Sequence, residues 1–403
     1  MSARLTRLRL PRGFTSRKLV GMSLVGRPRS PGFTSWKPVR MLLACRRITR
    51  GLSWCRPVGS LLVGRGVPRG LVPARLLWLV CLVCVLVSGC TRAVAPLAPP
   101  PSAAPTPVPP VTFPRDALPH DVLTEWWYYT GHLATPEGRP YGFEFTIFQI
   151  RRQDVPTAYV AHFAITDIAA QRFVHQARFT QGEPQPMPID VQGWRLALGD
   201  TISAALDDGP SLSIQLTDEK PPALHHGGYI DEGASVGGSY YYSRTRLSVT
   251  GDLSGTPVTG LAWMDHQWGN FIVPSSSIGG WDWYSLQLDD RSELMLYVLR
   301  GPTESPVFGS LIAPDGQVSE IQATAEALDH WTSPHTGAEY PSGWRITFPD
   351  HSLVLTPQLQ DQELYFPEAP PGTVPAYWEG AVTITGTHTG QGYVELTGYA
   401  PQR

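Results

Sequence analysis

From Asp121 onward the chain alternates apolar and polar residues with a period of two, and this pattern constrains the fold more than any other feature. Aromatic and β-branched residues occupy the alternate positions, and Gly, Pro and Asp-Gly turns such as Asp315-Gly316 separate the runs. The nearest approach to helical spacing is a short window, residues 321–328. The clearest strand-like runs are residues 141–150, 240–249, 283–288 and 293–299. The pattern predicts an all-β protein, and the segment from Asp121 onward is long enough for two barrels.

Acidic and basic residues are divided between two parts of the chain. Residues 1–89 contain 17 of the 32 Lys and Arg residues and no Asp or Glu. The remaining 15 basic residues stand against 34 acidic ones, a net charge of about −19. Nucleic-acid binding needs a basic face that neutralises phosphates, so this charge argues against a nucleic-acid partner. Residues 1–75 form a basic extension of no recognisable structural class, and we expect the true translation start to lie downstream.

An apolar run, Leu76–Val87, follows Arg75 and ends in the tetrapeptide Val87-Ser88-Gly89-Cys90. The run is shorter than the about 20 apolar residues that a transmembrane helix needs, but it has the length of a signal-peptide core. Its ending resembles the bacterial lipobox, in which the cysteine becomes the lipidated first residue of the mature protein. Residues 76–90 therefore predict an exported lipoprotein, anchored through Cys90 to a membrane of the bacterial cell envelope on its periplasmic or extracytoplasmic face. The alternative is an ordinary cleaved signal peptide that ends in a cysteine by chance.

Cysteines and prolines both mark where the folded part begins. All five cysteines lie at or before residue 90, so disulfides do not hold the predicted strands together. Cys81 and Cys84 have CxxC spacing, but they lie inside the apolar run and are interpreted as apolar filler. Residues 91–117 are rich in Ala, Pro, Val and Thr and predict a semi-rigid linker of polyproline II type. The domains expected beyond it are residues 118–300 and 301–403.

The most unusual stretch, residues 261–270, brings Asp265, His266 and Trp268 together. Alternate residues of an extended segment share a face, so Asp265 should point with Gln267, and His266 with Trp268. Core packing explains these residues, because Trp and Tyr line barrels and a buried Asp beside a His can be a satisfied polar pair. An acid and a base among aromatics also suit a ligand cavity. Further aromatic clusters lie at Glu125–Tyr129 and Gly279–Tyr284.

Several motifs occur in a fixed order between about residues 118 and 400. They are Glu125-Trp126-Trp127-Tyr128-Tyr129-Thr130-Gly131, Tyr240–Ser243, Trp263-Met-Asp-His-Gln-Trp-Gly269, Trp281-Asp-Trp-Tyr284, Leu286-Gln-Leu-Asp-Asp290, Tyr377–Val382 and Gly392–Tyr399. Together they resemble the AttH / carotenoid 1,2-hydratase (CrtC-like) family. The resemblance implies two tandem lipocalin-like β-barrel domains with an apolar cavity in or between them. Chemistries in this family include adding water to an isoprenoid double bond and cyclising polyenes, and many bacterial members are described as secreted hydrolases.

The hydratase resemblance also implies roles for particular residues. Hydrating an unactivated alkene needs a proton donor, a resting place for a carbocation, and a water molecule. A carboxylic acid buried among aromatics stays protonated, which suits Asp265 or Asp282 as the donor, and His266 would hold the water or take its proton. Indole and phenol faces stabilise a cation. The expected ligand-binding residues are Trp126, Trp127, Tyr128, Trp268, Trp281, Trp283 and Tyr284.

These observations lead to one leading interpretation and two alternatives. The leading one is a lipoprotein that binds a hydrophobic isoprenoid- or polyketide-like molecule and catalyses acid-assisted hydration or isomerisation of a C=C bond. The first alternative is a non-catalytic carrier of lipids or other hydrophobic ligands that works with a membrane export system. The second is a structural surface protein involved in attachment. No cofactor is expected, and the His225-His226 pair is interpreted as part of a loop rather than as a metal site.

Overall fold

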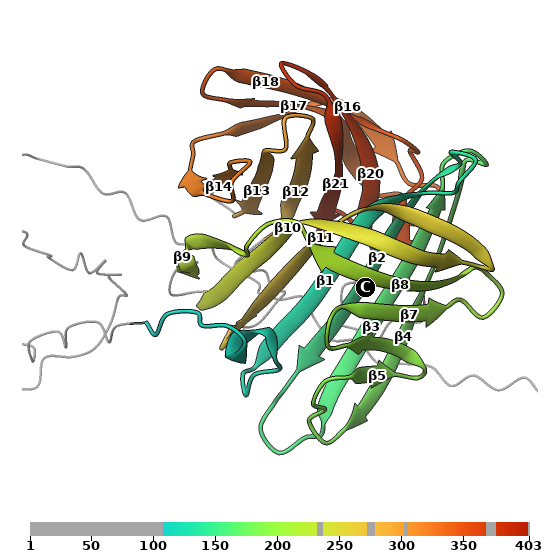
Figure 1. Ribbon diagram of the computed structural model, residues 1–403, viewed down its shortest axis with the longest axis vertical. Coiled ribbons are helices and arrows are strands. Elements are labelled where there is room, and N and C mark those ends of the chain that lie inside the picture. The colour runs from blue at the N-terminus through green and yellow to red at the C-terminus, as the bar shows by residue number, and fades with distance from the viewer. Residues whose placement is uncertain are drawn as a thin grey trace, which may run out of the picture. The chain divides into compact units, whose positions relative to one another are not determined.

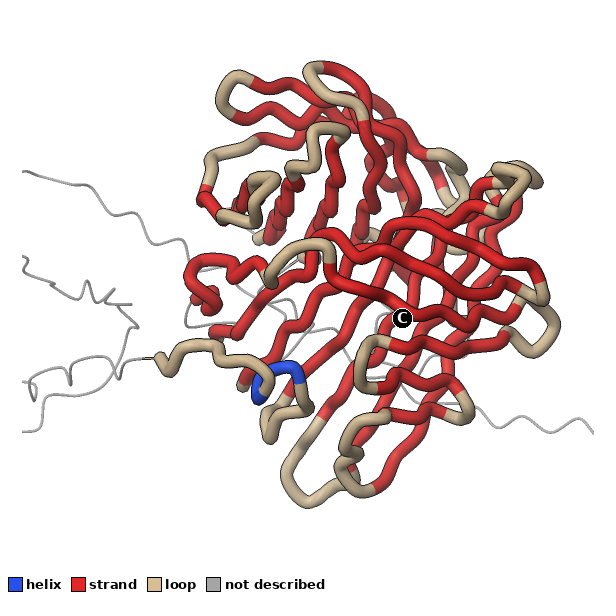
Figure 2. Tube along the Cα trace, in the orientation of Figure 1, coloured by secondary structure: helices blue, strands red, loops and turns tan. Residues whose placement is uncertain are grey.

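Strands form nearly all of the regular structure. The structure, a computed structural model, describes residues 108–231, 237–271, 279–301, 305, 307–367 and 376–401. Within these ranges the one helix is a short 3-10 turn, η1 (Arg115–Ala117), as Figure 2 shows. Among the residues that the structure describes, no helix is long and apolar enough to cross a membrane. The all-β prediction is confirmed, whereas the extension, the signal segment with Cys90 and most of the predicted linker lie outside the described residues.

The first sheet is antiparallel and carries eleven described strands. They follow the order β4-β3-β2-β1-β11-β10-β8-β7-β6-β5, and β9 pairs with β10. In Figure 1 these strands run from cyan through green to yellow. Their bounds are β1 (Thr124–Ala134), β2 (Pro140–Ile150), β3 (Thr157–Asp167), β4 (Arg172–Gly182), β5 (Ile189–Val191), β6 (Trp194–Ala197), β7 (Thr201–Ala205), β8 (Ser211–Asp218), β9 (Ala223–Asp231), β10 (Gly238–Leu253) and β11 (Thr256–Gly269).

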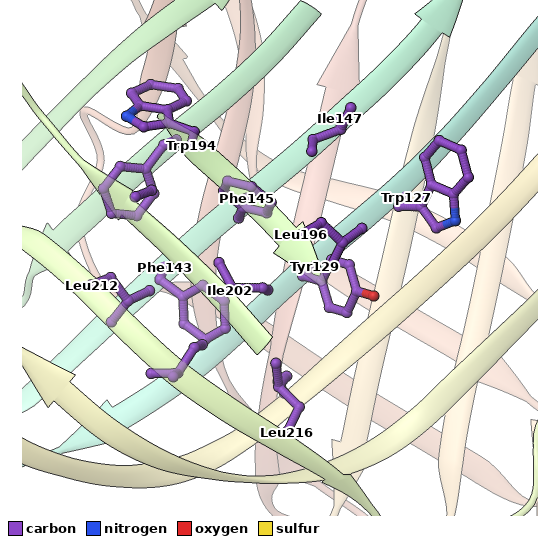
Figure 3. Close-up of a cluster of buried hydrophobic side chains, with 14 of the residues drawn as sticks. Trp127, Tyr129, Phe143, Phe145, Ile147, Trp194, Leu196, Ile202, Leu212 and Leu216 are labelled. Atoms are coloured by element: carbon purple, nitrogen blue, oxygen red, sulfur yellow. The ribbon is translucent and has the colours of Figure 1, made fainter. Parts of the chain in front are cut away.

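This sheet curls until its two end strands approach each other. Arg178 of β4 donates from Nη1 to the backbone oxygen of Gln192, at 2.6 Å, and the Gln192 amide donates to the backbone oxygen of Phe179, at 2.7 Å. The curled sheet encloses a core of large side chains, among them Trp127 and Trp194, which Figure 3 shows beside other apolar residues. We call the concave side that carries this core the inner face.

The second sheet is also antiparallel, with ten described strands. They follow the order β15-β14-β13-β12-β21-β20-β18-β17-β16, and β19 pairs with β20. It encloses a separate core that includes Tyr284, Trp344 and Trp378. Its strands are β12 (Gly280–Leu288), β13 (Glu293–Arg300), β14 (Val307–Ile312), β15 (Val318–Glu320), β16 (Thr324–Thr332), β17 (Glu339–Phe348), β18 (His351–Pro357), β19 (Glu363–Tyr365), β20 (Ala376–Gly386) and β21 (Gly390–Thr397).

The strand-like runs of the sequence all lie in strands, namely β2, β10, β12 and β13. Asp315-Gly316 lies in the turn between β14 and β15, with Gly316 at φ +89°. Most of the weakly helical window 321–328 lies in β16, because pairing with β17 outweighs its local spacing. The chain passes from one sheet to the other between Gly269 and Gly280, so the expected boundary at residue 300 falls at the last residue of β13.

The two sheets pack against each other through the outer face of the first. Figure 1 shows β12, β20 and β21 beside β10, β11 and β1, and contacts join β1 to β21 and β2 to β20. A buried aromatic cluster lies between the sheets, and we call it the interface cluster. Its largest members are Tyr128, Tyr241, Trp263, Trp283 and Tyr393.

The segment before β1 folds onto the first sheet. Val111 packs against the inner core, and the ring of Phe113 lies edge-on to Tyr242 with centroids 4.9 Å apart. Asp116 in η1 is only 3% exposed. The last residues of the predicted linker 91–117 therefore belong to the folded part of the chain.

Candidate functional site

Strand β11 carries the most unusual sequence motif and presents it on two opposite faces. Asp265 and Trp263 point toward the second sheet, where Trp263 belongs to the interface cluster. Met264 and Trp268 belong to the inner core, and on that same side His266 stacks on Trp127 and lies tilted against Trp268. The period of two predicts this division, and it separates Asp265 from His266 by the thickness of the sheet.

Asp265 is a buried carboxyl group surrounded by donors. Its side chain accepts hydrogen bonds from Tyr241 Oη at 2.5 Å, Ser243 Oγ at 2.5 Å and Trp263 Nε1 at 2.6 Å. Burial raises its pKa to about 7, although the three donors act in the opposite direction. At neutral pH the group therefore exists in both protonated and ionised forms, which suits proton transfer.

A buried hydrogen-bonded chain leads from Asp265 to the second sheet. His225 lies 2.7 Å from Ser243 through Nε2 and 2.9 Å from Ser310 of β14 through Nδ1. Because Ser243 donates to Asp265, the hydrogen on Nε2 of His225 must point to Ser243, and Nδ1 accepts from Ser310. Burial lowers the pKa of His225 to about 3, so this ring is neutral. Ser243 is therefore fixed as a donor to Asp265, which does not match a nucleophilic serine activated by histidine.

Three glutamates from different strands add to the buried acid at this interface. Burial, with repulsion from Glu395 and Glu144, raises the pKa of Glu379 well above its usual value. Burial likewise raises the pKa of Glu144 to about 8 and that of Glu395 to about 7. Tyr128 donates to Glu379 at 2.7 Å, whereas the other oxygen of Glu379 has no hydrogen-bond partner among the described residues. At pH 7 Glu144 is therefore mostly protonated, and Glu395, like Asp265, exists in both forms.

His266 belongs to a different polar group on the inner face. Its Nε2 lies 2.8 Å from Oε1 of Glu125, and Nδ1 of His120 lies 2.8 Å from the same oxygen. Burial alone would raise the pKa of Glu125, but hydrogen bonds from His120 and His266 outweigh it and lower that pKa. Burial lowers the pKa of His266. His266 and Asp265 therefore have separate partners on opposite faces of the sheet, as the alternation predicts.

Asp282 lies apart from both groups. It points into the second sheet's own core, where Arg300 Nε lies 3.0 Å from its Oδ1 and Tyr399 Oη donates at 3.0 Å. Burial raises its pKa, while Arg300 and Tyr399 oppose that shift. The three expected catalytic residues thus occupy three separate places in the fold.

The expected ligand-binding aromatics divide in the same way. Trp127 and Trp268 belong to the inner core, and Tyr284 to the core of the second sheet. Only four of the seven lie on the side of Asp265. These four are Tyr128 and Trp283, which are buried in the interface cluster, and Trp126 and Trp281, which are partly exposed at its edge.

The chain resembles known proteins in both sequence and structure. A sequence model described as AttH-like matches residues 104–399. The chain belongs to the AttH-like family. The crystal structure of a candidate AttH protein from Nitrosomonas europaea is 32% identical and superposes with a TM-score of 0.67, covering 73% of this chain and 99% of that one. The predicted tandem lipocalin-like fold and family resemblance are confirmed.

A second solved structure resembles this AttH-like protein in fold. Kievitone hydratase from Nectria haematococca is 17% identical, with a TM-score of 0.59, and the match covers 72% of this chain and 93% of that one. Among curated protein sequences, none matches the chain.

Sequence reasoning missed several residues of the AttH-like interface. The sequence places the His225-His226 pair in a loop, whereas the structure places His225 in β9, where it is fully buried. The three glutamates could have been found from the sequence. Glu144, Glu379 and Glu395 each interrupt an apolar strand at a position that alternation predicts to be buried. Tyr241 could also have been found from the sequence, because alternation places its side chain on the opposite face of the strand from that of Tyr242.

Proposed function

We propose that the chain binds a hydrophobic isoprenoid- or polyketide-like molecule between its two sheets, with Asp265 as the proton donor to a C=C bond. The observation that carries this proposal is a buried carboxyl group with a pKa of about 7 beside the rings of Trp263 and Trp283. Membership of the AttH-like family and the likeness in fold to a hydratase support it.

The proposed reaction is an acid-assisted hydration. Protonated Asp265 transfers its proton to one alkene carbon, and the electron pair of the double bond forms the new C–H bond. The resulting carbocation rests against electron-rich indole and phenol faces, such as those of Trp283 and Tyr128. Water then forms the C–O bond and returns a proton to the Asp265 carboxylate. Loss of a neighbouring proton in place of water addition gives isomerisation.

His266 and Asp282 have no part in this mechanism. His266 lies behind β11, and Asp282 lies on the face of β12 opposite Trp283. Asp282 therefore provides a control, because it is also an aspartate that accepts a tyrosine hydrogen bond, with a side chain 14% exposed.

The test has a binding stage and a turnover stage. Native mass spectrometry with lipid extraction on the purified protein asks whether an apolar molecule is retained. Turnover is then measured as ¹⁸O incorporation from labelled water into an acyclic polyene with trisubstituted terminal double bonds. We expect Asp265→Asn to bind the polyene as before while losing about 10²- to 10⁴-fold in turnover, and Asp282→Asn to retain turnover.

The carrier alternative makes a different forecast for the same variants. If the wild-type protein binds the polyene but does not turn it over, and Asp265→Asn binds equally well, the chain is a carrier and the catalytic proposal fails. A carrier of this kind would act beside a membrane export system. A protein that neither retains an apolar molecule nor takes up the polyene would favour the attachment alternative.

We also propose that the mature protein is anchored to a membrane of the bacterial cell envelope through a lipid on Cys90. The support is the apolar run Leu76–Val87 and the lipobox-like ending. Mass spectrometry of the mature N-terminus should find acylated Cys90. An unmodified cysteine there would contradict the anchor.

A further inference from the structure

Three side chains with metal-binding atoms meet on the inner face, on the opposite side of β11 from Asp265. They are His120, Glu125 and His266, whose candidate ligand atoms all lie within 4.8 Å of one another. One carboxylate oxygen, Oε1 of Glu125, lies 2.8 Å from Nδ1 of His120 and 2.8 Å from Nε2 of His266. Nothing in the proposed hydration chemistry uses this group.

We propose that these three residues form a binding site for a divalent transition metal of the zinc class. Two imidazoles and one carboxylate are the protein donors typical of zinc sites that keep a fourth position open. Zinc bonds of about 2.0–2.1 Å place tetrahedral ligand atoms about 3.3 Å apart, so each nitrogen must move about half an ångström from Glu125 Oε1.

The surrounding hydrogen bonds allow a tautomer in which both histidines act as metal ligands in place of donating to Glu125. Nε2 of His120 lies 3.3 Å from Oδ1 of Asp116, and Nδ1 of His266 lies 3.1 Å from the Tyr242 hydroxyl. When Nε2 of His120 carries its hydrogen toward Asp116, the lone pair of Nδ1 points at Glu125. A carboxylate oxygen flanked by two such nitrogens needs protons or a cation between them. Histidine held by a carboxylate on its far nitrogen is a recurrent feature of metal sites.

The other oxygen of Glu125 is held in place independently. Oε2 accepts hydrogen bonds from the His120 backbone N–H at 2.8 Å and from the Gln149 amide at 3.0 Å. Glu125 and His266 are fully buried, whereas the His120 side chain keeps 18% of its surface exposed, which gives an ion a route to the site. The carboxylate of Glu125 would offset part of the charge of a divalent ion, whereas that of Asp116 already forms an ion pair with Arg115.

The position of His120 means that a bound ion would link two separate parts of the chain. His120 lies on the segment before β1, stacked on Trp268 with ring centroids 4.3 Å apart. Glu125 and His266 belong to strands β1 and β11 of the sheet itself. A bound ion would therefore fasten the N-terminal segment, including η1, to the inner face.

Binding is tested on the full-length chain with its thiols alkylated. The five cysteines all lie at or before residue 90, so alkylation removes competing thiolates without changing any described residue. Cobalt(II) serves as a spectroscopic probe and zinc is measured by competition. We expect one equivalent to bind in the wild-type protein, and His120→Ala to lose at least 100-fold in affinity. Asp116→Asn removes the carboxylate that holds Nε2 of His120 and that also forms an ion pair with Arg115, and this variant should lose about 10- to 100-fold.

A matched control comes from an exposed group of similar residues. His388 lies near Asp289 and Asp290 on the surface, and His388→Ala should leave cobalt binding unchanged. Trypsin cleavage after the exposed Arg115 gives a second readout: zinc should slow it in the wild-type protein but not in His120→Ala. The proposal is overturned if the wild-type protein binds no more cobalt than His120→Ala, or if zinc leaves the cleavage rate unchanged. Neither result depends on Asp265, so this proposal and the hydration proposal can fail separately.

Discussion

At the scale of single residues, one buried carboxylate ties the two sheets together. Glu293 of β13 is completely buried and accepts hydrogen bonds from Lys220 Nζ and Arg246 Nε, both at 2.6 Å. Arg246 belongs to β10 of the first sheet, and Lys220 lies in the loop after β8. Removing the charge of Glu293 would leave two buried cations without their partner.

We therefore expect Glu293→Gln to lower the free energy of unfolding by about 3–5 kcal/mol, measured by urea denaturation. Glu326→Gln removes an exposed ion pair with Arg345, at 3.2 Å, and should change the same quantity by less than about 1 kcal/mol. Equal effects of the two substitutions would contradict the structural role assigned to Glu293.

At the scale of elements, the close pairing of β1 with β11 positions both polar groups. Gly260 of β11 leaves no room for a side chain, because an added Cβ would lie 1.9 Å from the backbone oxygen of His132. The neighbour is backbone, so the two strands must separate. Gly260→Ala should therefore lower the free energy of unfolding by about 1–3 kcal/mol in denaturant titrations.

Gly182 at the end of β4 is the control for this prediction. An added Cβ there meets nothing within 4 Å, and Gly182→Ala should be neutral within about 0.5 kcal/mol. If Gly260→Ala were as harmless as Gly182→Ala, β1 and β11 could not pair in a register that sets Gly260 against the backbone of His132.

The same strands show what sequence could and could not predict about the site. Alternation is a property of the local backbone, so it correctly placed Asp265 and His266 on opposite faces. Which face meets the second sheet depends on pairings between distant residues, such as Tyr128 with Asp265. The contact of His120 with Glu125 depends on the fold of a segment outside any predicted strand. For these reasons the sequence predicts which face of β11 each residue occupies, but not which distant residues it meets there.

At the scale of the whole molecule, the two sheets look alike in sequence. Both alternate with the same period, so no change of pattern marks the crossover between Gly269 and Gly280. The physical distinction between the sheets lies at their interface, where polar residues replace the apolar ones that alternation would place there. Glu144 and Glu395 are examples, and they determine how the fold responds to pH.

Burial holds the pKa of Asp265 and Glu395 at about 7 and that of Glu144 at about 8, far above the values near 4 of unfolded carboxyls. The folded state therefore binds more protons than the unfolded state up to pH 8, so stability falls as pH rises through these values. Below pH 6.5 buried histidines oppose this trend, because they must stay neutral in the folded protein. Burial lowers their pKa to about 4 for His132 and about 3 for His162 and His225.

These opposing groups predict maximal stability near pH 6. Between pH 6.5 and 8 Asp265, Glu395 and Glu144 together should lower the free energy of unfolding by about 3 kcal/mol, measured by urea denaturation across this range. Glu379, whose pKa burial also raises, should add to this decrease. Glu144→Gln cannot ionise and should remove about 1.5 kcal/mol of it, because Glu144 has the highest pKa of the first three groups. The exposed substitution Glu326→Gln should leave the pH dependence unchanged. A wild-type stability that is flat or rises from pH 6.5 to 8 would mean that the interface acids are ionised in the folded protein, and Asp265 would then lack the proton that the hydration proposal requires.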